Sequence, residues 1–167
     1  MDCAEFQRNI LAPALAQIAP VIGVPCGQDA QRIMLAIAGQ ESRWTWRYQL
    51  STGGADGSRA GPARGFWQFE RRGGVIGVMT HPETRDRAKA LCKATHVYWD
   101  DDDIWRALEG HNALAAGFAR LLLWTDPKSL PKSQEAGWDY YIRNWRPGKP
   151  HTHQWPLNWR AAEAALG

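Results

Sequence analysis

Apolar residues recur at helical spacing along most of the chain, and the densest run lies between Ile33 and Ala38. Ile33, Ile37 and Glu41 fall at i, i+4 and i+8, so this segment predicts a buried helix. Its last turn presents one carboxylate and one hydroxyl, those of Glu41 and Ser42. The same periodicity predicts further helices over residues 3–19, 82–95, 100–124, 132–145 and 157–166.

Proline and glycine indicate where this helical pattern is interrupted. Pro13 predicts a kink or break in the first helix, because proline lacks the amide hydrogen that a helix interior uses. The glycine-rich run 51–62 predicts a long surface loop or a small, irregular β excursion. Residues 65–70 indicate a short helix or turn, and residues 73–78 a close-packed link. The pattern predicts a mainly α fold, α+β in its details, with the excursion following the central helix.

The composition is that of one globular domain spanning residues 1–167. The chain has 167 residues, 44% of them hydrophobic, which is enough for a sizeable core. Its formal net charge of +3 is spread along the chain. This balance suits a polyanionic surface such as a bacterial cell wall and is too diffuse to indicate a nucleic-acid partner. Ten tryptophans suit both core packing and stacking on sugar faces.

The cysteines and histidines predict neither disulfides nor a metal or cofactor site. Cys3, Cys26 and Cys92 are an odd set without CxxC spacing and are expected to be reduced thiols. The histidines of 151–153 lack a nearby third ligand. The acidic run 100–103 has no calcium-loop spacing and is interpreted as the first turn of a helix.

The N-terminus and the apolar runs bear on where the protein acts. Residues 1–5 include two acids and no basic segment before an apolar one, so a signal peptide is not expected. No apolar run approaches the length of a membrane span, so membrane insertion is not expected either. A target outside the cytoplasm would require another route of delivery.

Glu41 is an unusual residue for its predicted position. A helix C-terminus carries partial negative charge, which makes a carboxylate there harder to ionise. Trp44, Trp46 and Tyr48 follow at once, and desolvation by aromatic surface would raise the pKa further. A carboxyl group that is protonated near neutral pH is a general acid. The alternative interpretation is a solvated glutamate at the end of a core helix.

The order of three short motifs resembles a known family. Glu41-Ser42, followed by Gly65-Phe66-Trp67-Gln68, is similar to the Glu-Ser and Gly-Leu-Met-Gln motifs of the lysozyme-like lytic transglycosylases, including small phage-encoded members. Residues 113–121 align with the family's Ala-Tyr-Asn-Ala-Gly motif. Leu114 and Ala115 stand where tyrosine and asparagine are expected, which removes two polar contacts of the family's cleft.

The resemblance extends over residues 28–145 and leaves the helices at 3–19 and 157–166 as additions. The family also has a tyrosine near the C-terminus that orients the acid or the scissile region. Tyr141 is the candidate for this position, and Tyr140 is the alternative. Gly65 and Gly117 are expected to allow close approach of the backbone to a ligand or a neighbouring helix.

The resemblance implies cleavage of the β-1,4 bond between N-acetylmuramic acid and N-acetylglucosamine in peptidoglycan, without a cofactor. Glu41 would protonate the leaving oxygen and then act as base while the sugar's own 6-hydroxyl closes an anhydro ring. Gln68 would hydrogen-bond the sugar, Ser42 would orient the substrate or Glu41, and Phe66 and Trp67 would form apolar walls. The cleft would lie between the Glu41 helix and residues 65–70.

Two alternatives remain open at this stage. A hydrolytic lysozyme, or muramidase, needs a second carboxylate, for which Glu70 and Asp56 are the candidates. The simpler interpretations are a surface ion pair for Glu70, beside Arg71 and Arg72, and a turn residue for Asp56. The other alternative is a virion structural or wall-binding protein with little activity.

Each interpretation predicts a place of action. A phage protein would be made in the host cytoplasm and reach the wall in the periplasm, either as an endolysin released at lysis or as part of a virion. Its partners would be peptidoglycan glycan strands and, in the second case, other virion proteins.

Overall fold

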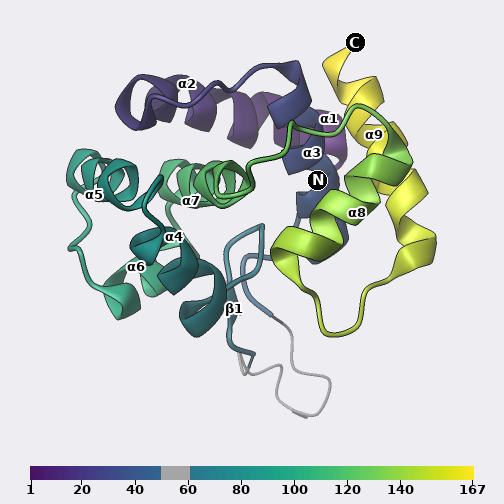
Figure 1. Ribbon diagram of the computed structural model, residues 1–167. Helices are drawn as coiled ribbons and strands as arrows, with labels where there is room; N and C mark the ends of the chain where they lie inside the picture. Colours follow the sequence, from purple (N-terminus) through teal and green to yellow (C-terminus); the bar gives the residue numbers. More distant parts are fainter. Residues whose placement is uncertain (50–60) are drawn as a thin grey trace.

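The mainly helical fold is built around a central apolar helix, α3. The computed structural model describes residues 1–49 and 61–167. The predicted helical fold with a small β element is confirmed: most of the chain is helical, and β1 and β2 form a two-stranded sheet on the side of the molecule between α4 and α8 (Figure 1). The elements, in chain order, are α1 (Cys3–Phe6), η1 (Gln7–Leu11), α2 (Ala12–Ile22), α3 (Gln28–Ser42), β1 (Ala63–Arg64), β2 (Phe69–Glu70), η2 (Arg71–Val75), α4 (Ile76–Thr80), α5 (Arg85–Ala94), α6 (Asp101–Ala107), α7 (Asn112–Trp124), α8 (Gln134–Trp145), η3 (Thr152–Gln154) and α9 (Trp155–Leu166).

Helix α3 is buried along nearly its whole length. Asp29 lies in its first turn and pairs with Arg32 at 2.8 Å, which suits the positive end of the helix. The residues from Ile33 to Gln40 are buried on every side, and α9 packs along α3. A helix that is apolar all round is expected to be enclosed. Beyond this enclosed stretch, the last turn returns toward the surface at Glu41.

The two terminal helices are part of the core rather than additions to it. The ring of Phe6 lies edge-on to that of Phe66, with centroids 4.8 Å apart. In α9, Trp155 and Trp159 are buried in the same hydrophobic cluster as α3. The side chain of Asn158 donates a hydrogen bond of 2.9 Å to Gln40. Residues 28–145 consequently lack part of the hydrophobic core on their own.

The first helical segment runs further than expected. The structure continues from Cys3 to Ile22 without a break at Pro13, with a π-helical turn, η1, placed just before the proline. The amide of Ala12 donates to the carbonyl of Gln7 in this wider turn. A π turn changes the hydrogen-bond spacing locally, so the chain accommodates the missing proline donor without ending the helix.

The predicted helix over residues 100–124 is wrong, because the structure divides it into α6 and α7. Asp100 caps α6 by accepting hydrogen bonds from the amides of Asp102 and Asp103. The chain leaves the helical conformation before His111, whose imidazole accepts from the amide of Leu114 and caps α7. A second cap inside one apolar run starts a second helix.

Three shorter segments also differ from the sequence-based expectation. Residues 73–78 are helical, in η2 and α4, rather than a link. Helix α5 begins at Arg85, after a turn that contains Pro82, and α9 begins at Trp155. Residues 65–68 form a turn, as one of the two expectations had it, and residues 69–70 continue into the second strand of a β-hairpin.

In this hairpin β1 and β2 pair antiparallel, with Ala63 opposite Glu70 and Arg64 opposite Phe69. Gly65 has a φ of +74°, and a Cβ at this position would lie 2.8 Å from the backbone oxygen of Leu108. Positive φ and close backbone approach both require glycine here. The hairpin thus fixes the positions of Gln68 and Glu70.

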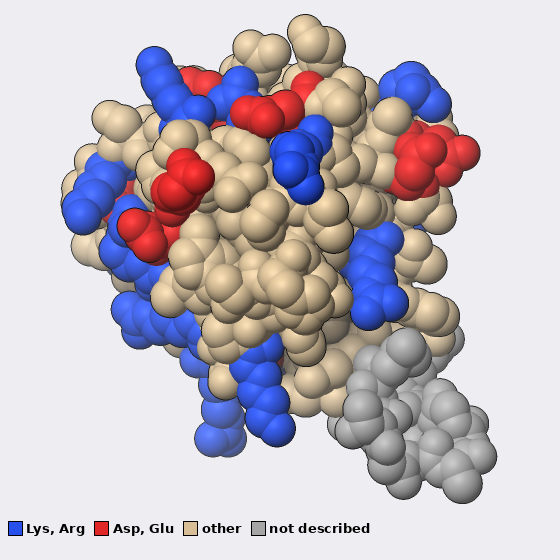
Figure 2. All heavy atoms as spheres, turned by 90° about the vertical axis from the view of Figure 1, so that its right-hand side faces the viewer, with Lys and Arg blue, Asp and Glu red and all other residues tan. Residues whose placement is uncertain are grey.

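On the face over α8 and α9, neither basic nor acidic side chains predominate (Figure 2). Figure 2 shows a broad uncharged area there, with basic and acidic side chains together around its margin. Within the described part of the chain, none of the helices has the length and apolar character that crossing a bilayer requires.

We predict that Gly65→Ala destabilises the protein by about 1–3 kcal/mol, because it adds strain at positive φ and a clash with Leu108. Urea unfolding followed by circular dichroism would measure this. Gly77→Ala is the matched control: it lies in α4 with nothing within 4 Å of the added carbon. It should stay within about 1 kcal/mol of wild type, on the stabilising side. Equal stability of the two variants would contradict the account of the hairpin.

Candidate functional site

The candidate site lies at the C-terminal end of α3, where Glu41 occupies the last turn. Arg43 and Trp44 follow in left-handed conformation, with φ of 52° and 54°, and turn the chain sharply away from the helix axis. The indole of Trp44 donates a 2.9 Å hydrogen bond back to the carbonyl of Leu35. The sharp turn leaves the Glu41 side chain partly exposed at the helix end.

The Tyr141 hydroxyl is the direct partner of this acid. It donates a hydrogen bond of 2.6 Å to Oε1 of Glu41, across a separation of 100 residues in the chain. Tyr140, the alternative, faces the other way: its hydroxyl donates 2.7 Å to the carbonyl of Leu123. The structure therefore brings together Glu41 and Tyr141, and it separates Tyr140 from them.

An aromatic stack from α8 and α9 fixes the tyrosine. The rings of Tyr141 and Trp155 are stacked, with centroids 5.3 Å apart and an interplanar angle of 13°. Trp138 packs on both of them, at 5.6 and 5.7 Å. The Trp155 indole donates 2.8 Å to the carbonyl of Gln134. Because these rings are packed, the hydroxyl of Tyr141 is held in place rather than free to rotate away.

The pKa of Glu41 is raised to about 7, chiefly by burial of the carboxyl group. The hydrogen bond from Tyr141 acts in the opposite direction and lowers this pKa, while the negative charge of Glu70 raises it. Burial and the neighbouring Glu41 raise the pKa of the Tyr141 hydroxyl, so this group remains a donor. Near neutral pH the Glu41 carboxyl is thus divided between its protonated and ionised forms.

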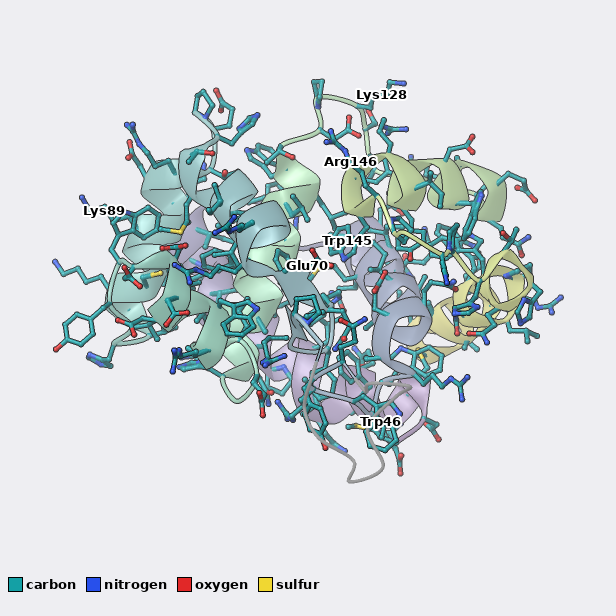
Figure 3. The ribbon with its side chains drawn as sticks, turned by 90° about the horizontal axis from the view of Figure 1, so that it is seen from below. Trp46, Glu70, Lys89, Lys128, Trp145 and Arg146 are labelled. Carbon is teal, nitrogen blue, oxygen red and sulfur yellow. The ribbon has the colours of Figure 1, made fainter. Side chains whose placement is uncertain are left out.

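Glu70 lies on the exposed side of β2, and its charge acts on Glu41. In Figure 3 its label lies beside Trp145 near the middle of the view, away from Trp46. Arg71, next in sequence, pairs with Asp101 at 2.6 Å and with Asp102 at 3.2 Å instead. The expected ion pair of Glu70 with Arg71 is therefore not formed. Asp56, the other candidate second acid, lies outside the described residues.

Phe66 and Trp67 are core residues, which differs from their expected role as cleft walls. Their side chains are 1% and 0% exposed. The Trp67 indole donates 2.9 Å to the carbonyl of Met34 in α3, and the guanidinium of Arg47 lies 4.3 Å from the Phe66 ring centroid. They anchor the end of the hairpin to α3 instead of contacting a ligand.

Ser42 and Gln68 are both engaged within the protein. The hydroxyl of Ser42 donates 2.9 Å to the carbonyl of Ala38, one turn back along α3. The side-chain amide of Gln68 donates 2.8 Å to the carbonyl of Gly65 and closes the hairpin turn. Gln68 remains partly exposed next to the site, and its proposed contact with a sugar stays a prediction.

Trp145 lies beside the site and is not among the candidate residues taken from the sequence. Its indole donates 2.9 Å to the carbonyl of Trp67, and its ring lies edge-on to Phe69 at 5.8 Å. It remains partly exposed beside Glu70 (Figure 3). Its position four residues after Tyr141, one helical turn further along α8, was the available signal.

The remaining motif positions have structural roles. Leu114 and Ala115 are buried in α7 and offer no polar group. A Cβ added to Gly117 would lie 2.2 Å from Leu91 of α5, so this glycine permits close helix packing. Asn112 accepts 2.7 Å from Arg47. Within residues 1–49 and 61–167, no group of three or more His, Cys, Asp or Glu side chains is arranged to hold a metal ion.

Comparisons with protein-family models, curated proteins and solved structures found no match for this chain. The chemistry of the site is therefore inferred from its own residues. They supply one carboxyl group that exchanges a proton near pH 7, a fixed phenolic donor, and a second carboxylate whose charge acts on the first.

We predict that Tyr141→Phe raises the pKa of Glu41 by about one pH unit, because it removes the donor that favours the ionised form. Carbon-13 NMR titration of the Glu41 carboxyl would measure this. Tyr140→Phe is the matched control and should leave the Glu41 pKa unchanged, since its hydroxyl bonds to Leu123. A lower pKa in Tyr141→Phe would contradict the assigned role of the hydrogen bond.

The raised pKa of Glu41 makes the stability of the protein depend on pH. The folded-state pKa of Glu41, about 7, lies above the ordinary value of 4.5, so the folded protein binds more protons than the unfolded chain between these values. The contribution of Glu41 to the free energy of unfolding therefore falls as pH rises from about 4.5 to 7. Glu41→Gln should become more stable relative to wild type over this window. Urea unfolding at a series of pH values would test this, and a constant difference would argue against the raised pKa.

Proposed function

We propose that this protein is a glycosidase-type enzyme that cleaves the glycan strands of peptidoglycan, with Glu41 as general acid. The observation that carries this proposal is the 2.6 Å hydrogen bond from Tyr141 to a partly buried carboxyl group with a pKa of about 7. A carboxyl group in this state can give a proton to a leaving oxygen at neutral pH and take one back. The lysozyme-like fold type is part of the same proposal.

The reaction we favour is that of a lytic transglycosylase. Glu41 protonates the glycosidic oxygen between N-acetylmuramic acid and N-acetylglucosamine as that bond breaks. The resulting carboxylate then accepts the proton of the sugar's 6-hydroxyl, which closes the anhydro ring. Tyr141 stabilises the carboxylate between the two steps, because its hydrogen bond favours the ionised form.

A hydrolytic lysozyme is the second candidate, and the position of Glu70 favours it. The charge of Glu70 acts on Glu41, and Glu70 is exposed at the edge of the hairpin. A second carboxylate near the acid is what a hydrolase uses to activate water or to stabilise the cationic sugar. The two candidates share Glu41 and differ in whether water enters the product.

We expect mass spectrometry of digested peptidoglycan to show muramyl products that are one water lighter than hydrolysed ones. Glu41→Gln should reduce product release by about a hundredfold or more, since the general acid is lost. Glu135→Gln, an exposed residue in the first turn of α8, is the matched control and should release products at the wild-type rate.

Two results would contradict the transglycosylase proposal and support a different function. Products that contain the added water, together with loss of activity in Glu70→Gln, would identify a hydrolase. Equal release by wild type and Glu41→Gln, or no release by either, would instead indicate a wall-binding or virion structural protein.

A further inference from the structure

A buried arginine lines a cavity whose wall does not include Glu41. Arg120, in α7, is 1% exposed. Its Nε donates 2.8 Å to the carbonyl of Pro25, while its buried Nη1 has no hydrogen-bond partner. Among the described residues, no carboxylate forms an ion pair with it. Burying an uncompensated cation costs several kcal/mol, so such a group needs a reason to be there.

The neighbouring groups only partly compensate this charge. The Trp124 ring centroid lies 5.4 Å from the guanidinium carbon, which provides a cation–π contact. The Cys26 thiol donates to the carbonyl of Val24. Burial raises the pKa of this thiol, although the charge of Arg120 and a side-chain hydrogen bond with Arg120 both act to lower it. Cys26 is therefore neutral near pH 7 and, despite this hydrogen bond, supplies no counter-charge.

Arg120 lines a cavity of about 430 Å³ between α7, α8 and the loop that joins them. Part of its wall is apolar and comes from Pro25, Leu123, Trp124 and Leu130. Lys128 is an exposed residue of the same wall, and in Figure 3 it lies at the edge of the molecule while Glu70 lies near the middle. The cavity combines a buried cation, a second cation and apolar surface.

The two acids of this wall limit what can bind. Asp126 is already neutralised: it accepts 2.7 Å from Arg143 and 2.9 Å from Asn144. Glu83 is an exposed carboxylate of the wall. Glu83 repels an anion in proportion to its charge, so a ligand with two negative charges is disfavoured more strongly than a single carboxylate, which can pair with the guanidinium of Arg120.

We propose that this cavity is a binding site for a small organic monocarboxylate with an apolar body. The carboxylate pairs with Arg120 and is attracted by Lys128, and the apolar part packs against Leu123, Trp124 and Leu130. This site is separate from Glu41, and its ligand binding does not depend on the glycosidase chemistry proposed above.

The test is a methyl NMR titration of the full-length protein with benzoate, with neutral benzamide of the same shape as the control ligand. We expect benzoate, and not benzamide, to shift the methyl signals of Leu123 and Leu130. Arg120→Met should weaken benzoate binding by about tenfold or more, and Lys128→Gln by about two- to fivefold. Lys89→Gln, an exposed lysine of α5 on another edge of the molecule (Figure 3), is the matched control and should bind as wild type.

Several outcomes would overturn the proposal: no shift at these methyl groups, equal shifts with benzamide, or equal affinity in wild type and Arg120→Met. Inorganic phosphate that binds this site more tightly than benzoate would overturn the assignment to monocarboxylates. If Arg120→Met does not fold, the benzoate and benzamide titrations of wild type, with Lys128→Gln, decide the matter. Glu41→Gln should bind benzoate as wild type does, which separates this result from that of the glycosidase test.

Discussion

The enclosure of α3 is the constraint on which the rest of the structure depends. Because the residues from Ile33 to Gln40 face protein on all sides, η1, α7 and α9 pack around them, and beyond this stretch the last turn returns toward the surface. That turn holds Glu41. The burial that stabilises the helix therefore also removes water from the carboxyl group, which is the main cause of its raised pKa. The same burial thus stabilises the fold and raises the pKa of Glu41.

Local patterns predicted much of the fold. They failed where a single capping side chain or contacts between distant residues determine the structure. The periodicity around Ile33 and Ile37 predicted α3, and the run before Trp145 predicted α8. The division between α6 and α7 was missed because the apolar pattern continues across it, while the cap at His111 depends on a single side chain. A small β element was expected, but its position at residues 63–70 was missed because Phe66 and Trp67 are held by Phe6 and Met34, which are distant in sequence.

The candidate site was predictable to a similar extent. The position of Glu41 at a helix end indicated a weakened acid, and the resemblance to a known family indicated Tyr141 as its partner. Sequence alone could not distinguish Phe66 and Trp67 as core residues from cleft walls, since aromatic residues serve both purposes. Nor could it show that Trp155 stacks on Tyr141, because that contact depends on how α9 packs against α8.

The stacking of Trp155 on Tyr141 has a consequence for fragments of this protein. Every residue that carries the family resemblance lies before Trp155, so a fragment chosen by motifs would end with α8. Such a fragment would retain Glu41 and Tyr141. It would lose Trp155, whose ring holds the Tyr141 hydroxyl in position, and it would leave uncovered the face of α3 that packs against α9. The segment that can be recognised by its motifs is thus shorter than the segment that holds Tyr141 and α3 in place.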